Sequence, residues 1–201
     1  MIGWVYDLLS RSAEKGELGR RRHDLLSGLE GTVLEIGAGT GLNLPHYQQA
    51  EKVVAVEPDP SMARRLPGRI AEASVPVEVV AGSAETLPFP DGAFDTVVIT
   101  FVLCSVADPA AALAEIRRVL APRGRLVLLE HVRGDDELAR WQNRLTPLHR
   151  KLAGNCHLNR DTKRAVAEAG FDATGIATTR IPGSHPLVRS GIQGVAIKTS
   201  S

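Results

Sequence analysis

Three glycines at alternate positions, Gly37, Gly39 and Gly41, follow directly on the apolar stretch 33–36, and Glu57 stands twenty positions after Gly37. Glycine lets the backbone turn sharply and approach a ligand closely, because it carries no Cβ and adopts positive φ at little steric cost. A carboxylate at the end of the next strand can accept hydrogen bonds from both hydroxyls of a ribose. These residues therefore predict a site for a nucleotide-like cofactor.

The spacing of the glycines distinguishes between two kinds of cofactor. A dinucleotide fingerprint reads G-x-G-x-x-G, and this chain has Leu42 where the third glycine of that pattern would stand. The pattern G-x-G-x-G resembles that of the class I methyltransferases, which bind S-adenosylmethionine. The resemblance implies S-adenosylmethionine as the methyl donor and S-adenosylhomocysteine as the product, in place of a nicotinamide dinucleotide.

The elements that must position these residues alternate along the chain. Short runs rich in valine, isoleucine and leucine predict buried strands at 33–36, 52–57, 75–81, 96–102 and 125–130. Helical spacing predicts helices at 42–49, 61–73, 110–120, 137–152 and 160–169. Two final runs, 174–181 and 194–199, predict an antiparallel edge. We expect an α/β fold with a Rossmann-like, doubly wound sheet, mostly parallel with an antiparallel C-terminal edge and helices on both faces.

Length and composition limit the classes of protein to consider. With 201 residues and 43% hydrophobic content, the chain is long enough for one α/β domain and too short for two. We expect a single methyltransferase domain over 1–201, with an N-terminal helical cover at 1–30 and a helical insertion near the substrate site at 134–160. The balance of 24 basic and 23 acidic side chains argues against a nucleic-acid partner. Two cysteines make no disulfide framework and no segment is apolar enough for a membrane span, so we expect a cytoplasmic protein, either a monomer or a homodimer.

The resemblance to class I methyltransferases extends over the middle of the chain. The loop 82–89 follows the third predicted strand, and the turn 91–95, with acidic and aromatic residues, leads into the fourth. This order resembles that of methyltransferases, in which the loop after the third strand contacts adenine. Ser83 stands where many relatives carry an aspartate that accepts a hydrogen bond from the adenine amino group. The cofactor-binding residues that this resemblance implies are Glu35, Gly37, Ala38, Gly39, Gly41, Asn43, Glu57, Pro58, Ser83, Ala84, Glu85 and Phe101.

Several of these assignments have alternatives. Asp59, two residues after Glu57, is a possible substitute as the ribose acid, and Glu85 can equally be a solvated loop residue. Glu35 would be costly to bury without a partner, so it is expected to meet a backbone amide or the cationic amino group of the ligand, or to serve an internal structural role.

A narrower resemblance begins near Phe101. The stretches 102–106, 129–132, 141–142 and 156–162 are similar to those of the small-thiol S-methyltransferases known in animals as the methyltransferase-like seven group. Animal members of that group carry an N-terminal membrane anchor, and we expect none in this chain. The resemblance implies that Cys104, Trp141 and His157 line the substrate site. It also makes a small thiol the expected methyl acceptor.

His131, directly after the fifth predicted strand, is the candidate for a catalytic base. The carboxyl ends of strands line the site in an open α/β sheet, and the ordinary pKa of histidine is about 6.5. The alternative is that His131 only holds a loop. We expect no metal site, because the six histidines are scattered and no C-x-x-C pair is present.

The sequence leaves the acceptor open. The expected activity is transfer of a methyl group from S-adenosylmethionine to a small thiol. The alternatives are a C- or N-methyltransferase acting on a quinone or phospholipid acceptor, since the block 87–91 also occurs in such enzymes, and a module without activity that senses the cofactor or binds a partner.

Overall fold

The computed structural model describes residue 14 and residues 16–199. Its centre is an eight-stranded sheet in the order β3-β2-β1-β4-β5-β8-β6, with β7 paired to β8. Strands β1 to β5 are parallel to one another, and β8 runs antiparallel to β5. The strands are β1 (Thr32–Ile36), β2 (Lys52–Val56), β3 (Val77–Val80), β4 (Phe94–Thr100), β5 (Leu120–His131), β6 (Phe171–Asp172), β7 (Ile176–Arg180) and β8 (Ser190–Lys198). This confirms the predicted fold class.

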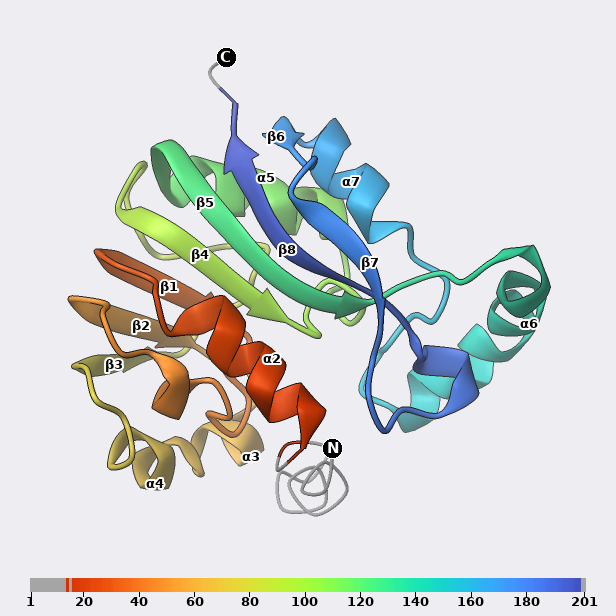
Figure 1. The fold of residues 1–201 in the computed structure, drawn as a ribbon, viewed down its shortest axis with the longest axis horizontal. Helices are drawn as coiled ribbons and strands as arrows, with labels where there is room; N and C mark the ends of the chain where they lie inside the picture. The colour runs from red at the N-terminus through yellow and green to blue at the C-terminus, as the bar shows by residue number, and fades with distance from the viewer. Residues whose placement is uncertain (1–13, 15, 200–201) are drawn as a thin grey trace.

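Helices lie on both faces of the sheet. In Figure 1, α2 crosses one face beside β1, α5 lies behind the sheet and α6 projects away from it. The helices are α2 (Glu17–Leu26), the 3₁₀ turn η1 (Leu44–His46), α3 (Pro60–Ala63), α4 (Leu66–Ile70), α5 (Pro109–Val119), α6 (Asp136–Leu152), α7 (Thr162–Glu168) and the 3₁₀ turn η2 (Pro186–Val188).

Alternate residues of the central strands face opposite sides, as the period of a strand requires. On one side Val33, Val53 and Val98 pack with Leu26 of α2 and with Tyr47, which follows η1. On the other side Leu34, Val54, Val97 and Leu128 pack with Leu113 and Ile116 of α5 and with Val166 of α7. The sheet is therefore covered on both sides, and this fixes the carboxyl ends of β1, β2 and β4 relative to one another.

The structure corrects some predicted boundaries. The helix predicted after the glycine turn is only the single turn η1. Pro45 excludes a helix that begins at residue 42, because it has no N–H to donate to the Gly41 carbonyl, and the extended backbone of Tyr47 ends the turn. The helix predicted at 61–73 is divided into α3 and α4, with Pro67 in the first turn of the second. Residues 1–13 and 15 of the predicted N-terminal cover lie outside the described residues, and α2 is the part of it that the structure describes.

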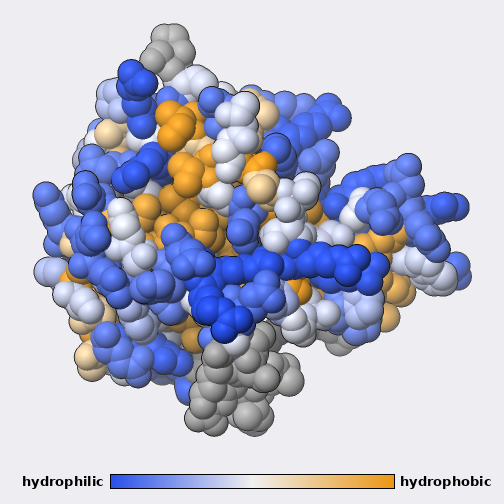
Figure 2. Space-filling model, viewed as in Figure 1, coloured by the Kyte–Doolittle hydropathy of each residue, from blue (hydrophilic) through white to orange (hydrophobic). Residues whose placement is uncertain are grey.

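The insertion predicted at 134–160 contains α6, which is attached to the sheet through a buried glutamine. The Gln142 side chain donates to the carbonyls of Val132 and Leu187 and accepts from the Gly134 amide. These bonds fix one face of α6 to the end of β5. On the face shown in Figure 2, hydrophobic side chains gather over β4, β5 and β8, beside α2.

Candidate functional site

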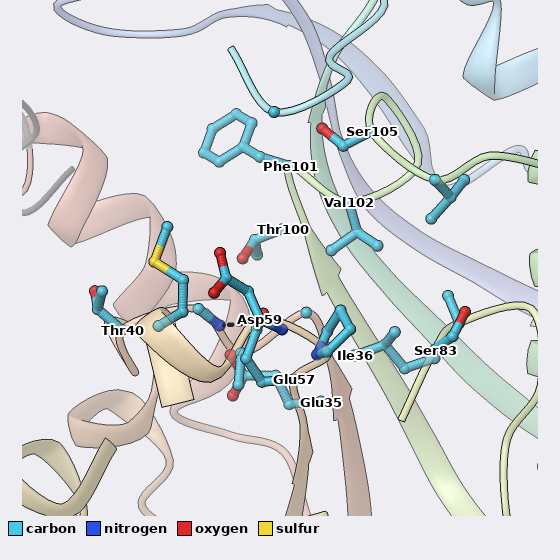
Figure 3. Close-up of a pocket in the computed structure, with 18 of the residues that line it drawn as sticks. Glu35, Ile36, Thr40, Glu57, Asp59, Ser83, Thr100, Phe101, Val102 and Ser105 are labelled. Atoms are coloured by element: carbon cyan, nitrogen blue, oxygen red, sulfur yellow. Dashed lines mark hydrogen bonds between the residues drawn. The ribbon is translucent and has the colours of Figure 1, made fainter. Parts of the chain in front are cut away.

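A cavity of about 510 Å³ lies at the carboxyl ends of β1, β2 and β4. Figure 3 shows Glu35, Glu57 and Asp59 together on one side of it, Phe101 and Ser105 at the opposite end, and Ser83 on a third side. The predicted site residues in its wall are Glu35, Gly37, Ala38, Gly39, Asn43, Glu57, Pro58, Ser83, Ala84, Glu85 and Phe101. The position agrees with the rule that open parallel sheets bind ligands beyond the carboxyl ends of their strands.

The glycine turn has the backbone that the sequence predicts. Gly37, Gly39 and Gly41 have φ of 68°, 59° and 84°, in the left-handed region that glycine adopts at least cost. A Cβ on Gly39 would meet nothing closer than the Gly37 carbonyl oxygen at 3.9 Å, since this residue faces the cavity. Gly41 differs, because a Cβ there would come within 2.8 Å of Arg69, and Gly41 is not part of the cavity wall.

Glu57 is joined to the glycine turn by its carboxylate. It accepts hydrogen bonds from the amides of Gly39 at 2.7 Å and Asp59 at 2.9 Å, and its residue is only 7% exposed. Burial raises the pKa of Glu57, and the two amide hydrogen bonds oppose that rise. Asp59 instead caps α3 by accepting from the Ser61 amide at 2.7 Å. The two carboxylates therefore have different structural roles, because Glu57 is hydrogen-bonded to the glycine turn and Asp59 caps α3.

Glu35 lies at the centre of a buried polar network. Its two carboxylate oxygens accept from the Asn43 amide group and the Tyr47 hydroxyl, each at 2.9 Å. Asn43 in turn accepts from the guanidinium of Arg22 on α2 at 2.7 Å. Among the described residues, Glu35 is thus held by the side chains of Asn43 and Tyr47, and not by the backbone amide that the sequence left open. Arg22, which sequence reasoning missed, connects α2 to the cavity wall.

The network makes stability depend on pH, because burial raises the pKa of Glu35 to about 7 against the hydrogen bonds from Tyr47 and Asn43. The unfolded chain releases this proton near pH ~4.3, so the stabilisation is complete below that pH and declines by about 3–4 kcal/mol as the pH rises from there through about 7. Glu35→Gln cannot ionise, and its unfolding free energy should fall less steeply between pH ~5 and ~7. Denaturant unfolding at a series of pH values measures this. Identical slopes for both proteins would contradict it.

The side near Ser83 contains a second carboxylate network. The Ser83 hydroxyl donates to Glu85, whose other oxygen accepts from the Ala107 amide at 2.8 Å. Burial acts to raise the pKa of Glu85, but the hydrogen bonds from Ser83 and the neighbouring amides outweigh it and lower the pKa. Glu85 is therefore a fixed anion in the wall rather than a solvated loop residue. It ties the loop after β3 to the start of α5.

Phe101 and Asn155 mark the other end of the cavity. Both have positive φ, 58° and 66°, although neither is glycine, and such strained residues concentrate at functional sites. The Phe101 ring stacks on the His131 ring, with centroids 6.4 Å apart, and the Arg22 guanidinium lies 5.8 Å from the Phe101 centroid. Asn155 donates to the Ser105 carbonyl at 2.8 Å. Residues after α6 thus complete the wall at this end.

Four residues predicted for catalysis or substrate contact lie outside the cavity wall. His131 is buried behind Phe101, and Cys104 lies beside it with only 2% of its surface exposed. The His157 amide donates to the Cys104 carbonyl at 2.7 Å, so this histidine packs behind the same wall. Trp141 is 54% exposed on α6. The structure thus places these four side chains outside the wall of this cavity, and their roles in catalysis and substrate contact stay predictions.

The structure also brings together groups whose spacing in the sequence suggested no set of metal ligands. The ligand atoms of Cys104, His131 and Cys156 lie within 4.8 Å of one another, and all three residues are buried. The neighbouring Cys156 thiol and burial raise the pKa of Cys104 well above its ordinary value. Cys104 is thus a protonated thiol in this arrangement and not a ready nucleophile.

Comparison with known proteins agrees with this geometry. The family described as a methyltransferase domain matches residues 34–128. The thiol S-methyltransferase TMT1B of Rattus norvegicus is 35% identical over 175 residues, which cover 84% of this chain and 71% of that protein. The demethylmenaquinone methyltransferase of Thermus thermophilus is 41% identical over 133 residues, covering 62% of this chain and 60% of that protein.

A solved structure gives the same result for the fold. The crystal structure of an S-adenosylmethionine-dependent methyltransferase from Thermotoga maritima, described as a possible histamine N-methyltransferase, aligns with a TM-score of 0.68. The two chains are 25% identical, and the alignment covers 96% of this chain and 93% of the other. Among the described residues, no helix combines the length and apolar content that crossing a bilayer requires.

Proposed function

The chain belongs to the class I S-adenosylmethionine-dependent methyltransferases, and from this premise we propose that it methylates the sulfur of a small thiol. The proposal places the ribose of the donor at Glu57 and the adenine beside Ser83, Ala84 and Glu85. The methionine part would then extend past Gly37 toward Phe101. This order follows the wall of the cavity from its acidic side to its apolar end.

The single observation that carries the thiol proposal is the chemistry of the acceptor end. Within the described residues, the wall there includes the uncharged groups Phe101, Val102, Ser105, Val106, Ala153 and Asn155. The guanidinium of Arg22, 5.8 Å from the Phe101 centroid, is a cation and not a base. The carboxylates Glu35, Glu57 and Glu85 are already engaged in hydrogen bonds with protein groups. No titratable side chain of this end is therefore placed to remove a proton from an acceptor.

A thiol tolerates such an environment better than the alternative acceptors do. Its ordinary pKa is about 8.5, so a few per cent is already the reactive thiolate near pH 7. An amine is protonated at that pH, and a quinol carbon must lose a proton during the reaction, so both need a base. The sulfonium donor brings its own activation, and alignment of sulfur and methyl carbon supplies much of the remaining acceleration. His131, behind Phe101, takes no part in this mechanism.

A panel of acceptors tests the proposal. Purified protein is incubated with S-adenosylmethionine and 2-mercaptoethanol, an aromatic thiol, a reduced quinone or phosphatidylethanolamine vesicles, and the methylated product is identified by mass. Ethylene glycol is the matched control, since it offers a hydroxyl in place of the sulfur. We expect methylation of the thiols only. Methylation of the quinol or the amine with no thiol product would contradict the proposal, and bound cofactor without turnover on any acceptor would favour a cofactor-sensing module.

The dependence of the rate on pH should follow the acceptor. If no group of the enzyme removes the proton, the rate at subsaturating thiol should rise about tenfold per pH unit below the pKa of that thiol. It should then level off at a lower pH for an aromatic thiol than for an alkyl thiol. Initial rates for both thiols between pH ~5.5 and ~9.5 measure this. A common inflection near pH ~6.5 for both acceptors would instead indicate an enzymic base such as a histidine.

A further inference from the structure

Three segments of the chain meet behind the acceptor end of the cavity. Cys104 follows β4, His131 is the last residue of β5, and Cys156 follows α6. Their sulfur and ring nitrogen atoms lie within 4.8 Å of one another, and the Nε2 atom of His131 is 2.9 Å from the Cys156 sulfur. The exposed fractions are 2%, 7% and 8%, so the cluster is closed to bulk solvent. The proposed reaction uses none of these groups.

Two sulfurs and one imidazole nitrogen form a donor set that zinc prefers. Zinc binds thiolate at ~2.3 Å and imidazole at ~2.0–2.1 Å, which places neighbouring ligand atoms of a tetrahedron about 3.5–3.8 Å apart. The distances in the cluster span this range, from 2.9 Å to at most 4.8 Å. Small side-chain adjustments would bring all three atoms to one ion. The absence of a carboxylate oxygen from this group disfavours magnesium and calcium, which bind oxygen.

Two polar atoms next to the cluster are buried without a hydrogen-bond partner among the residues that the structure describes. They are the Nδ1 atom of His131 and the Oε2 atom of Glu130. Glu130 is fully buried, and only its other oxygen is engaged, by the amides of Val102 and Leu103. Buried polar atoms are nearly always satisfied by a hydrogen bond, and burying a carboxylate is costly unless its charge is compensated. A cation held by the adjacent histidine would provide positive charge at this place.

We propose that Cys104, His131 and Cys156 bind one zinc ion. Three protein ligands leave a fourth position, which water occupies in sites of this composition. The ion would join the segment after α6 to the ends of β4 and β5. Since Ala153, Gly154 and Asn155 line the cavity immediately before Cys156, the ion would also fix the acceptor end of the wall. The site stands apart from the proposed function, because metal binding needs neither methyl donor nor thiol acceptor.

Metal titration of the reduced, chelator-stripped protein without an affinity tag tests the proposal. We expect one equivalent of Zn²⁺ to bind, as measured by competition with a chromogenic chelator, and to raise the midpoint of thermal unfolding. Co²⁺ in the same site should give visible bands of tetrahedral cobalt and near-ultraviolet charge-transfer absorption from its thiolates. The cobalt spectrum of the unaltered protein needs no variant and stays informative if a substitution disturbs folding.

Variants locate the ion. Cys104→Ser and Cys156→Ser should each weaken Zn²⁺ binding by at least about tenfold, since even residues that only support a metal ligand have effects of that size. Each should also weaken the thiolate absorption of the cobalt form. His185→Ala removes an exposed histidine far along the chain and is the matched control that should bind like the wild type. Absence of stoichiometric Zn²⁺ binding, a cobalt spectrum without thiolate absorption, or binding lost in His185→Ala but retained in Cys104→Ser would overturn the proposal.

Discussion

Gly39→Val is expected to abolish measurable binding of S-adenosylmethionine while leaving the folded sheet in place. A Cβ at Gly39 has room among the protein atoms, because its nearest neighbour is a carbonyl oxygen at 3.9 Å. The branched side chain would therefore extend into the space that we assign to the cofactor. Loss of affinity would come from this occupied volume, and isothermal titration calorimetry with S-adenosylhomocysteine measures it directly.

A second glycine separates this effect from backbone strain. Gly39 has φ of 59°, where a β-branched residue is strained whatever space surrounds it. Gly92 has φ of 67°, lies outside the cavity wall, and would place a Cβ no closer than 3.8 Å to another atom. Gly92→Val thus reproduces the strain without reaching the site. Both variants should lose comparable stability, and only Gly39→Val should lose the cofactor. Normal affinity in Gly39→Val would refute the assignment of the turn.

Glu57→Ala is expected to weaken cofactor binding by about 1.5–3 kcal/mol, roughly 10- to 150-fold in Kd, if charge-assisted hydrogen bonds to both ribose hydroxyls are lost. Part of the effect would come from the glycine turn, because Glu57 also accepts from the Gly39 amide. Calorimetry of the variant and the wild type in the same buffer measures the difference, and the raised pKa of Glu57 makes a weakly alkaline buffer the better choice because it favours the carboxylate.

Asp59 supplies the matched control for Glu57. It stands two residues later and also lines the cavity, but its carboxylate caps α3. Asp59→Asn keeps a side chain that caps helices well. Its cofactor affinity should therefore stay close to that of the wild type. If Asp59→Asn lost the affinity and Glu57→Ala kept it, the ribose would have to be assigned to Asp59.

The parts of this fold that could be predicted are those with a local cause. The runs around Leu34, Val54 and Val97 are apolar on both faces, which predicts buried parallel strands before any contact is known. Gly39 and Glu57 follow such strands, so their meeting at the sheet edge was predictable from topology alone. The helix after the glycine turn was predicted wrongly, because spacing of apolar residues outweighed the effect of Pro45.

The rest depends on contacts between distant segments. Arg22 reaches Asn43 only because α2 lies across the sheet, and Asn155 enters the cavity wall because the chain after α6 folds back on the end of β4. His131 and Cys156 are 25 positions apart, so no ligand spacing in the sequence indicates that they meet. The exposed side of Trp141 is likewise set by how α6 packs, with Gln142 inward.

The pH dependence of Glu35 and that of the methyl transfer report on different groups. Glu35 changes stability because burial raises its pKa, whereas the transfer rate is expected to follow the pKa of the acceptor thiol. The two profiles can be compared in one protein. If the unfolding free energy and the transfer rate change over different pH ranges, the buried network around Glu35 stabilises the fold and does not take a proton from the acceptor.

The most direct test of the account is a calorimetric titration of the purified protein with S-adenosylhomocysteine, and with NAD in parallel. The cavity beside Gly39 and Glu57 should bind one molecule of S-adenosylhomocysteine, with affinity that falls in both variants, and NAD should give no measurable heat. Absence of binding by S-adenosylhomocysteine and S-adenosylmethionine, or tight binding of NAD at this site, would contradict the account.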